Sequence, residues 1–343
     1  MRAMVLRGPN TPFEKVTLPD PTPGPGEAVA RVITCGAGLT IQHVKAGRRK
    51  VTFPRIIGHE ITGEIVALGA GVSALKVGDP VTAYFYLNCG HCRHCLSQRE
   101  PLCPHSGGNV GMECDGGYAE YIKLPAHIFI RLPEALDHRK HPAEIGVITD
   151  ALATPLKVLR RAAVRPGETV AVIGAGGGVG IHQVMIARWA HARVIAVDVA
   201  AEKFAACRRA GAQETVDPSA VDPVEALRAL THGRGVDVVI DYVCTADTLE
   251  AGVKALGRGG RLVVLGGAAR PFTAPAHDLL TNEQSILGSR YVTRADILEA
   301  CDLVARGDIW PLVTELRPLE EAEAVHARLE RGAVTGRAVL QVA

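Results

Sequence analysis

Short apolar runs, separated by glycine and proline, make up most of the first 150 residues of the chain. The Pro/Gly-rich stretch PDPTPGPGEAVARV leads into a predicted strand at 28–33. Further short strands are predicted at 61–68, 80–86 and 117–124. This pattern predicts a lobe built as an irregular β-barrel.

From residue 169 the pattern changes to longer apolar strands that alternate with helical segments. Continuous apolar strands of this kind indicate a parallel sheet covered by helices on both faces. The predicted strands are 169–173, 193–198, 214–216, 236–243 and 261–267. Two predicted helices follow the first two strands and end near 189 and 210, and three more span 223–230, 246–256 and 294–306. Short strands return at the end of the chain, where the last is 338–342.

The expected fold class is therefore α/β, with an irregular β-barrel lobe and a doubly wound parallel sheet. The first lobe is predicted to be discontinuous. It comprises residues 1–150 and 291–343, with the parallel-sheet domain at 151–290 inserted between them.

Composition supports a two-domain protein and excludes some functions. The chain has 343 residues, 47% of them hydrophobic, and a formal net charge of +2, so a large core and two domains are expected. No basic run indicates nucleic-acid binding, and no uninterrupted apolar stretch reaches membrane-spanning length. The first residues, MRAMVLRGPN, lack the apolar region of a secretory signal, so a cytoplasmic location is expected.

Four cysteines share one short loop, 88–104, with two, two and seven residues between them. They are Cys89, Cys92, Cys95 and Cys103, in NCGHCRHCLSQREPLC. Four thiolates at this spacing can enclose one ion, and a closed all-sulfur tetrahedron is typical of structural zinc. The alternative is a pair of disulfides, which a reducing cytosol disfavours.

A glycine-rich turn follows the strand at 169–173 and opens a helix. Its residues are Gly174, Ala175, Gly176, Gly177, Gly178, Val179 and Gly180. This context predicts a pyrophosphate site at the helix N-terminus. Asp198, at the end of the next strand, can accept hydrogen bonds from ribose hydroxyls and favours NAD over NADP, while Lys203 is placed to flank the adenosine. The alternative is a glycine-rich turn in a sheet that binds no nucleotide.

The cysteine loop and the nucleotide motif together resemble the medium-chain dehydrogenases/reductases of the zinc-type alcohol dehydrogenase family. The resemblance implies a GroES-like catalytic lobe, a Rossmann domain and a homodimer or homotetramer. It also implies hydride transfer between NAD(H) and a small alcohol, aldehyde or ketone. GRGGRLVVLGG at 257–267 resembles the family's strand beside the nicotinamide. By the same resemblance Thr154 abuts the nicotinamide and Arg294 contacts the cofactor; the alternative for Arg294 is an ordinary surface residue.

The resemblance is incomplete where the family holds its catalytic zinc. His59 and Glu60 match the GHE motif, and Asp150 falls at the third ligand position. The first ligand position, normally a cysteine, falls on Gly38, and Ile41 replaces the usual aspartate. The second zinc is then weakly held or absent, because a thiolate and the support of the ligand histidine are both missing. The alternative is a site completed by His59, Glu60 and Asp150 with water, or by Cys35, three residues upstream of the ligand position.

Thr40 and His43 occupy the positions where the family's proton relay begins and ends. A hydroxyl can hold the substrate oxygen, and a histidine can pass its proton to water. The alternative is that both are polar loop residues. Three functions follow: an NAD(H)-dependent alcohol dehydrogenase or carbonyl reductase, a zinc-independent enone reductase, or a non-catalytic NAD sensor.

Overall fold

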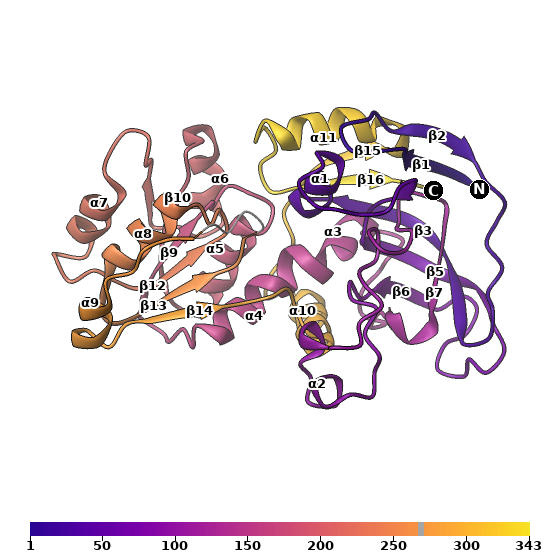
Figure 1. Ribbon diagram of the computed structural model, residues 1–343, viewed down its shortest axis with the longest axis horizontal. Coiled ribbons are helices and arrows are strands. Elements are labelled where there is room, and N and C mark those ends of the chain that lie inside the picture. Colours follow the sequence, from indigo (N-terminus) through magenta and orange to yellow (C-terminus); the bar gives the residue numbers. More distant parts are fainter. Residues whose placement is uncertain (267–270) are drawn as a thin grey trace. The chain divides into compact units, whose positions relative to one another are not determined.

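The computed structural model describes residues 1–266 and 271–343, which form two units (Figure 1). Unit 1 comprises Met1–Ala153 and Val292–Ala343, and unit 2 comprises Thr154–Tyr291. Gly267, the last residue of the predicted nicotinamide-side strand, lies outside the described residues.

Unit 1 is built on two sheets. In the larger one the strand order is β15-β16-β3-β5-β6-β8, and β7 also pairs with β3. In the smaller one β1 lies between β2 and β4. Their bounds are β1 Arg2–Leu6, β2 Glu14–Thr17, β3 Glu27–Ala37, β4 Arg55–Ile56, β5 Glu60–Leu68, β6 Pro80–Ala83, β7 Tyr121–Pro125, β8 Phe129–Arg131, β15 Val313–Pro318 and β16 Arg337–Gln341.

Three of these strands differ in length from the prediction. β3 continues to Ala37, where it carries the site described below. β6 ends at Ala83, since the three aromatic residues that follow leave the ladder and pack edge to face, with Phe85 and Tyr86 ring centroids 5.0 Å apart. β7 begins only at Tyr121, because Gly117 donates instead to the carbonyl of Gly58.

The helices of unit 1 are short and held by side chains as well as by apolar packing. They are α1 Leu39–Lys45, α2 Arg93–Leu96, α3 Pro142–Val147, α10 Arg294–Ala305 and α11 Ala322–Glu330, with a π-helical turn, η3, at Ile148–Leu152. Hydroxyls of Thr34 and Thr62 both donate to the Pro142 carbonyl at 2.8 Å. These bonds fix the start of α3 on the sheet and place the π turn that follows.

Unit 2 is a single parallel sheet with the order β11-β10-β9-β12-β13-β14. This is the doubly wound order in which the chain reverses direction beside the first strand. Strands are β9 Thr169–Ile173, β10 Arg193–Val197, β11 Glu214–Val216, β12 Val236–Asp241, β13 Leu256–Val264 and β14 Ser285–Gly288. Helices are α4 Ala153–Arg161, α5 Gly180–Trp189, α6 Phe204–Arg209, α7 Pro223–Leu230, α8 Ala246–Ala255 and α9 Ala276–Thr281.

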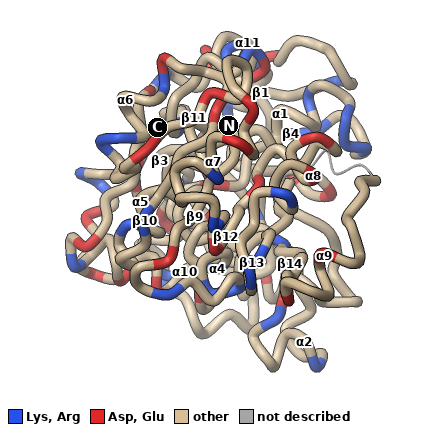
Figure 2. Tube along the Cα trace, turned by 90° about the vertical axis from the view of Figure 1, so that its left-hand side faces the viewer, with Lys and Arg blue, Asp and Glu red and all other residues tan. Residues whose placement is uncertain are grey.

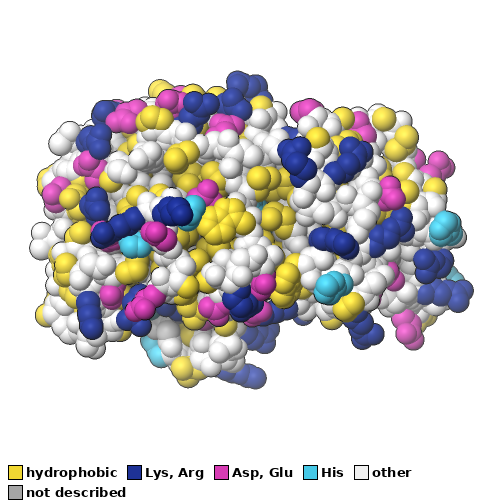
Figure 3. Space-filling view, turned by 180° about the vertical axis from the view of Figure 1, so that it is seen from behind, with side chains coloured by type: hydrophobic (Ala, Val, Ile, Leu, Met, Phe, Trp, Pro, Cys, Tyr) yellow, Lys and Arg dark blue, Asp and Glu magenta, His cyan; other side chains and the backbone are white. Residues whose placement is uncertain are grey.

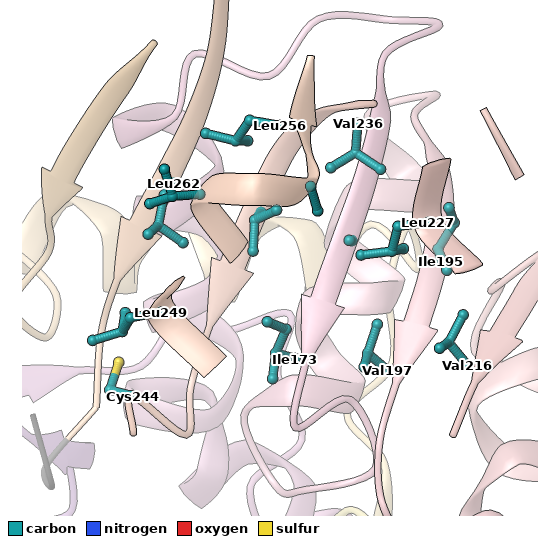
Figure 4. Close-up of a cluster of buried hydrophobic side chains, with 14 residues drawn as sticks. Ile173, Ile195, Val197, Val216, Leu227, Val236, Cys244, Leu249, Leu256 and Leu262 are labelled. Atoms are coloured by element: carbon teal, nitrogen blue, oxygen red, sulfur yellow. The ribbon is translucent and has the colours of Figure 1, made fainter. Parts of the chain in front are cut away.

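The core of unit 2 explains why its strands are apolar without alternation. Side chains of β9 are buried along its whole length, as expected for a strand covered on both faces. On one face, Ile173, Ile195 and Val239 pack with Leu249 and Leu262 in a larger apolar cluster (Figure 4). The predicted α/β fold class is thus confirmed in both units.

Charges are mixed over the surface. Lys and Arg are interspersed with Asp and Glu along the chain trace (Figure 2). A space-filling view of one face shows the same mixture, with hydrophobic side chains between the charges (Figure 3). Among the described residues, no helix is long and apolar enough to cross a membrane.

Candidate active site

The four loop cysteines point their sulfur atoms at one another. The Sγ–Sγ distances are 3.5 Å for Cys92–Cys95, 3.6 Å for Cys103–Cys89, 3.8 Å for Cys92–Cys103 and 3.9 Å for Cys89–Cys95. Four sulfurs around a zinc at ~2.3 Å would be ~3.8 Å apart. All four cysteines are free, whereas a disulfide needs ~2 Å, so the disulfide alternative fails. The site fits one zinc ion with no open coordination position.

Polar contacts around this loop set the orientation of its ligands. The Asn88 side-chain amide donates to Cys95 Sγ at 3.6 Å. His91 Nδ1 lies 2.8 Å from the Cys89 carbonyl, so this imidazole bonds the loop backbone. These hydrogen bonds orient the ligand loop independently of the ion, as hydrogen bonds to metal ligands commonly do.

The glycine turn of unit 2 closes tightly between β9 and α5. Gly174 has φ +77°, a conformation that favours glycine. A Cβ on Gly180 would collide with the Gly174 carbonyl oxygen, so the helix can start this close to the strand only with glycine. No side chain caps α5, as expected for a helix N-terminus that receives a pyrophosphate.

Asp198 lies at the end of β10, beside this turn. Its Oδ2 accepts a hydrogen bond from Gly176 N at 2.7 Å, and its Oδ1 accepts one from Ala200 N at 3.0 Å. The side chain of Lys203 is buried against Gly176, where a Cβ would lie 2.5 Å from Lys203 Cδ. The carboxylate is half-buried and oriented by two backbone groups, so these residues fit an NAD(H) ribose.

Two other predicted cofactor residues lie in separate units. Thr154 is buried at the start of α4. Arg294 belongs to unit 1, where its Nη1 donates to the His127 carbonyl at 2.7 Å and its Nη2 to the Phe129 carbonyl at 3.2 Å. This arginine therefore supports the backbone of its own unit, and its contact with a cofactor remains a prediction.

Helix α1 carries Thr40 and His43 and is anchored to α11. Gln42 donates to Glu330 Oε2 at 2.7 Å and accepts from His326 Nδ1 at 2.6 Å. Burial lowers the pKa of His43 below its ordinary value, and the nearby Arg48 lowers it further. His43 is therefore neutral at pH 7 and able to accept a proton.

His59, Glu60 and Asp150 come together in unit 1, as the sequence predicted. One ligand atom from each lies within 4.8 Å of the others, and all three are buried. Asp150 is carried by the π turn η3, a feature frequent at functional sites. Its Oδ2 lies 3.4 Å from His59 Nε2, and the His59 ring packs on Phe85 with centroids 4.5 Å apart.

A fourth residue of this cluster, Arg337, was missed by the sequence analysis. Its Nε donates to Glu60 Oε2 at 2.9 Å and its Nη2 to the other oxygen, a bidentate pair. Nη2 also donates to Asp150 Oδ2 at 3.3 Å. Arg337 is 4% exposed, and although burial lowers its pKa to about 10 it remains a cation at neutral pH.

The register of three neighbouring strands explains how Arg337 reaches Glu60. In the order β16-β3-β5, Ala338 pairs with Ala37 and Gly36 pairs with Glu60. The arginine therefore crosses the end of the middle strand, over Gly36 and over Gly38, which follows the strand. A Cβ at Gly36 would collide with the Glu60 carboxylate, and one at Gly38 would lie 2.8 Å from both Nη1 and Nη2 of Arg337.

These residues do not fit the family's catalytic zinc. Gly38 supplies no ligand atom, and the carboxylates of Glu60 and Asp150 are already bonded to a guanidinium. Cys35 offers no replacement, because successive residues of a strand face opposite sides of the sheet. Its Sγ lies 2.7 Å from the Cβ position of Gly58 and 2.9 Å from that of Gly117.

Nothing in the local sequence marked Arg337 as part of this cluster. It starts a short apolar strand after a glycine. The available signal was indirect, namely a glycine at the expected ligand position, which leaves room for another side chain.

Comparison with known proteins gives consistent matches over the whole chain. The family models "Alcohol dehydrogenase GroES-like domain" and "Zinc-binding dehydrogenase" match residues 24–134 and 178–306. An alcohol dehydrogenase of Geobacillus stearothermophilus is 36% identical over 100% of this chain and 99% of its own length. An NAD-dependent alcohol dehydrogenase of Sulfurisphaera tokodaii is 32% identical, with 99% of each covered. The crystal structure of the Aeropyrum pernix alcohol dehydrogenase has a TM-score of 0.91 at 31% identity, covering 99% of this chain and 100% of that one.

Proposed function

This chain belongs to the zinc-type alcohol dehydrogenase family of medium-chain dehydrogenases/reductases, and from that premise we propose that it is an enzyme transferring a hydride between NAD(H) and an alcohol or carbonyl substrate. The observation that carries the proposal is the glycine turn with Asp198 beside it. Gly176 N donates to Asp198 at 2.7 Å, so a hydrogen bond fixes the ribose acceptor against the pyrophosphate turn. The relative from Sulfurisphaera tokodaii is named NAD-dependent, which agrees with a carboxylate at this position.

The chain's own residues supply cofactor binding and proton transfer, while bound NAD(H) supplies the hydride. In alcohol oxidation the substrate hydroxyl loses its proton to Thr40 and then to His43. His43 suits this role because burial keeps it neutral. In carbonyl reduction the same two groups return a proton to the oxygen that receives the electron pair.

A second candidate is reduction of an α,β-unsaturated carbonyl compound. The observation in its favour is Arg337, which bonds Glu60 and Asp150 where the family binds a Lewis-acid zinc. Without that ion, alkoxide formation from an unactivated alcohol receives less support than in a zinc enzyme. A non-catalytic NAD sensor is the weakest alternative, since Thr40 and His43 are both retained.

The proposed setting is a homodimer or homotetramer in the cytoplasm. The four zinc thiolates need a reducing compartment, and the family resemblance indicates an oligomer. Multi-angle light scattering on the purified protein would give the oligomeric state directly.

A substrate panel tests the proposed function. Purified protein would be incubated with NADH and with matched saturated ketones, aldehydes and enones, and products would be identified by mass spectrometry. We expect NADH oxidation with stoichiometric reduced product in at least one class. NADH binding without turnover on any of them would favour the sensor.

A further inference from the structure

We propose that helix α11 positions the relay helix α1 through a buried chain of hydrogen bonds, in which His326 and Glu330 are the positioning residues. These two residues act on Thr40 and His43 from outside the relay. They set the direction of its side chains and the charge around His43. The positioning of the relay rests on the proposed function, whereas the charge around His43 can be measured without turnover.

Helix α1 does not fix its own orientation. It has seven residues, no side chain caps its N-terminus at Gly38, and its first turn holds no acidic residue, so it lacks the length and the cap of a helix that is stable by itself. Thr40 and His43 lie three positions apart and share one face of the helix, while Gln42 lies about 100° from His43. The contacts of Gln42 therefore decide where the Thr40–His43 face points.

Both groups of the Gln42 amide are bound by α11, which lies beside α1 (Figure 1). The Gln42 Nε2 donates to Glu330 Oε2 at 2.7 Å, and its Oε1 lies 2.6 Å from His326 Nδ1. His326 Nε2 in turn lies 2.9 Å from the Tyr118 hydroxyl. Gln42 is 4% exposed, and His326 and Tyr118 are fully buried, so water does not compete for these bonds.

The ionised carboxylate of Glu330 determines which atoms of the chain carry protons. Arg48 bonds both of its oxygens, at 2.7 and 2.5 Å, and together with Gln42 lowers the pKa of Glu330 to about 2, so this side chain only accepts. Gln42 must then turn its Nε2 to Glu330 and its Oε1 to His326, which donates from Nδ1. Burial lowers the pKa of His326 to about 3, so its Nε2 carries no proton and accepts from Tyr118.

A paired chain of this kind specifies one rotation of α1. Apolar side chains fill a buried space in several orientations, whereas buried polar groups must each meet a partner. The imidazole of His326 is also packed against the rings of Phe13 and Tyr118, with centroids 5.1 and 5.8 Å away. Gln42, and with it the Thr40–His43 face, is therefore held in a single direction.

The same residues set the charge around His43. Besides burial, the groups that act on its imidazole are Arg48 and Arg49, which follow α1, and Glu330 of α11. The two arginines favour the neutral ring, whereas Glu330 favours the protonated ring. Because Arg48 and Glu330 are bonded to each other, their effects on His43 partly offset, and removal of one leaves the other uncompensated.

The charge effect is tested by NMR titration of isotope-labelled histidines in the free protein, with His43→Gln assigning the His43 signal. In Glu330→Gln the pKa of His43 should fall below the wild-type value, because Arg48 is uncompensated. In Arg48→Met it should rise, because Glu330 is uncompensated. Arg328→Met, which breaks a different ion pair of α11, 2.6 Å long to Glu315, should leave it unchanged. A rise in both Glu330→Gln and Arg48→Met would show only a loosened α1 and would overturn the charge effect.

The positioning effect is tested by steady-state kinetics on the most active substrate of the panel. His326→Phe leaves Gln42 Oε1 and the Tyr118 hydroxyl unpaired, so kcat should fall by about tenfold to a hundredfold, the effect of a misplaced proton-transfer pair. The NADH dissociation constant should stay within about twofold, since the loss belongs to the chemical step. His326→Asn should recover most of kcat, because its amide N–H replaces the Nδ1–H and keeps the bond to Gln42.

A second variant covers the case in which His326→Phe does not fold. Gln42→Leu breaks the chain from the side of α1 with an apolar side chain of similar size, and it should lower kcat in the same way. Wild-type kcat in folded His326→Phe or in Gln42→Leu would overturn the positioning role. Wild type that turns over no substrate would refute the proposed function, while the His43 titrations would still decide the charge effect.

Discussion

Asp198 shows how one side chain serves both the fold and the ligand. It accepts from Gly176 N at 2.7 Å, so the carboxylate shapes the pyrophosphate turn, and each of its oxygens can still accept a further hydrogen bond from a ribose hydroxyl. A carboxylate at this point also repels the additional phosphate of NADP(H). Cofactor preference should therefore depend on this residue.

Replacing Asp198 with Ala should weaken NADH binding by about tenfold or more, the value of a charge-assisted hydrogen bond. NADPH should lose much less, because repulsion disappears together with the acceptor. Dissociation constants from nucleotide fluorescence quenching would measure both. Asp247→Ala, an exposed carboxylate on α8 of the same unit, is the control. Tighter wild-type binding of NADPH than NADH would contradict the assignment.

His43 should set the acid limb of the pH profile of kcat for alcohol oxidation, the part in which kcat falls as the pH is lowered. Burial, and then Arg48 and Arg49, lower its pKa below 6.5, while Glu330 partly opposes them. Protonated His43 cannot accept a proton, so kcat should fall as the pH drops through this pKa, below 6.5, and stay level above it. In His43→Gln that limb should disappear, with His277→Gln as an exposed control. A limb that persists unchanged in His43→Gln would remove this histidine from the relay.

Among the structural elements, the loop 88–104 depends most on a bound ion. It has only the four-residue helix α2 and one 3₁₀ turn of regular structure. Its sulfur atoms lie 3.5–3.9 Å apart, an arrangement of thiolates that needs a central cation. Metal binding in such a loop contributes directly to folding.

Replacing Cys92 with Ser should therefore remove the loop zinc and destabilise unit 1. We expect a loss of about 3 kcal/mol or more, or ~6–12 °C in the midpoint of thermal unfolding. NADH affinity of the soluble fraction should stay nearly unchanged, since the glycine turn belongs to unit 2. Calorimetry and a zinc assay would measure this, with Cys114→Ser as the control outside the loop. A Cys92→Ser protein of full stability would argue against a structural zinc.

The glycine near the end of strand β3 is explained only by the side chains that the neighbouring strands β5 and β16 place over it. Gly36, in β3, lies under the Glu60 side chain, and Gly38, the residue between β3 and α1, lies under the Arg337 side chain. Glycine in a strand is unfavourable on its own, and here it is retained for the ion pair that crosses the strand.

Taken together, the two units divide the chemistry between them. Unit 2 carries the nucleotide turn, while unit 1 carries the zinc loop, the Thr40–His43 pair and the Arg337 cluster. A ligand that binds only the folded state of a unit stabilises that unit. The nucleotide should thus stabilise unit 2 directly.

NADH should raise the unfolding midpoint of the protein, with a stabilisation of about 2.7 kcal/mol at a hundred times its dissociation constant. NADPH at the same concentration should give a clearly smaller shift, because Asp198 disfavours it. Differential scanning fluorimetry over a concentration series would measure both. Equal shifts from the two nucleotides would contradict the proposed preference.

Features encoded over a few neighbouring residues were predictable from the sequence. The spacing of Cys89 to Cys103, the glycine turn from Gly174 to Gly180 and the apolar strands of unit 2 each express a local requirement, whether ligand geometry, backbone freedom or burial on two faces. Helices α7 and α8 begin where the pattern placed them, because Pro223 and the Thr245 cap act within one turn.

The Arg337 cluster could be recognised only in the folded chain. Its members come from β16, β5 and the π turn after α3, which lie far apart in the sequence and meet through strand pairing. Apolar periodicity shows that a strand exists but does not give its partner or register. From the sequence, Gly38 meant a missing zinc ligand; the register of β16 on β3 shows that a guanidinium lies there instead.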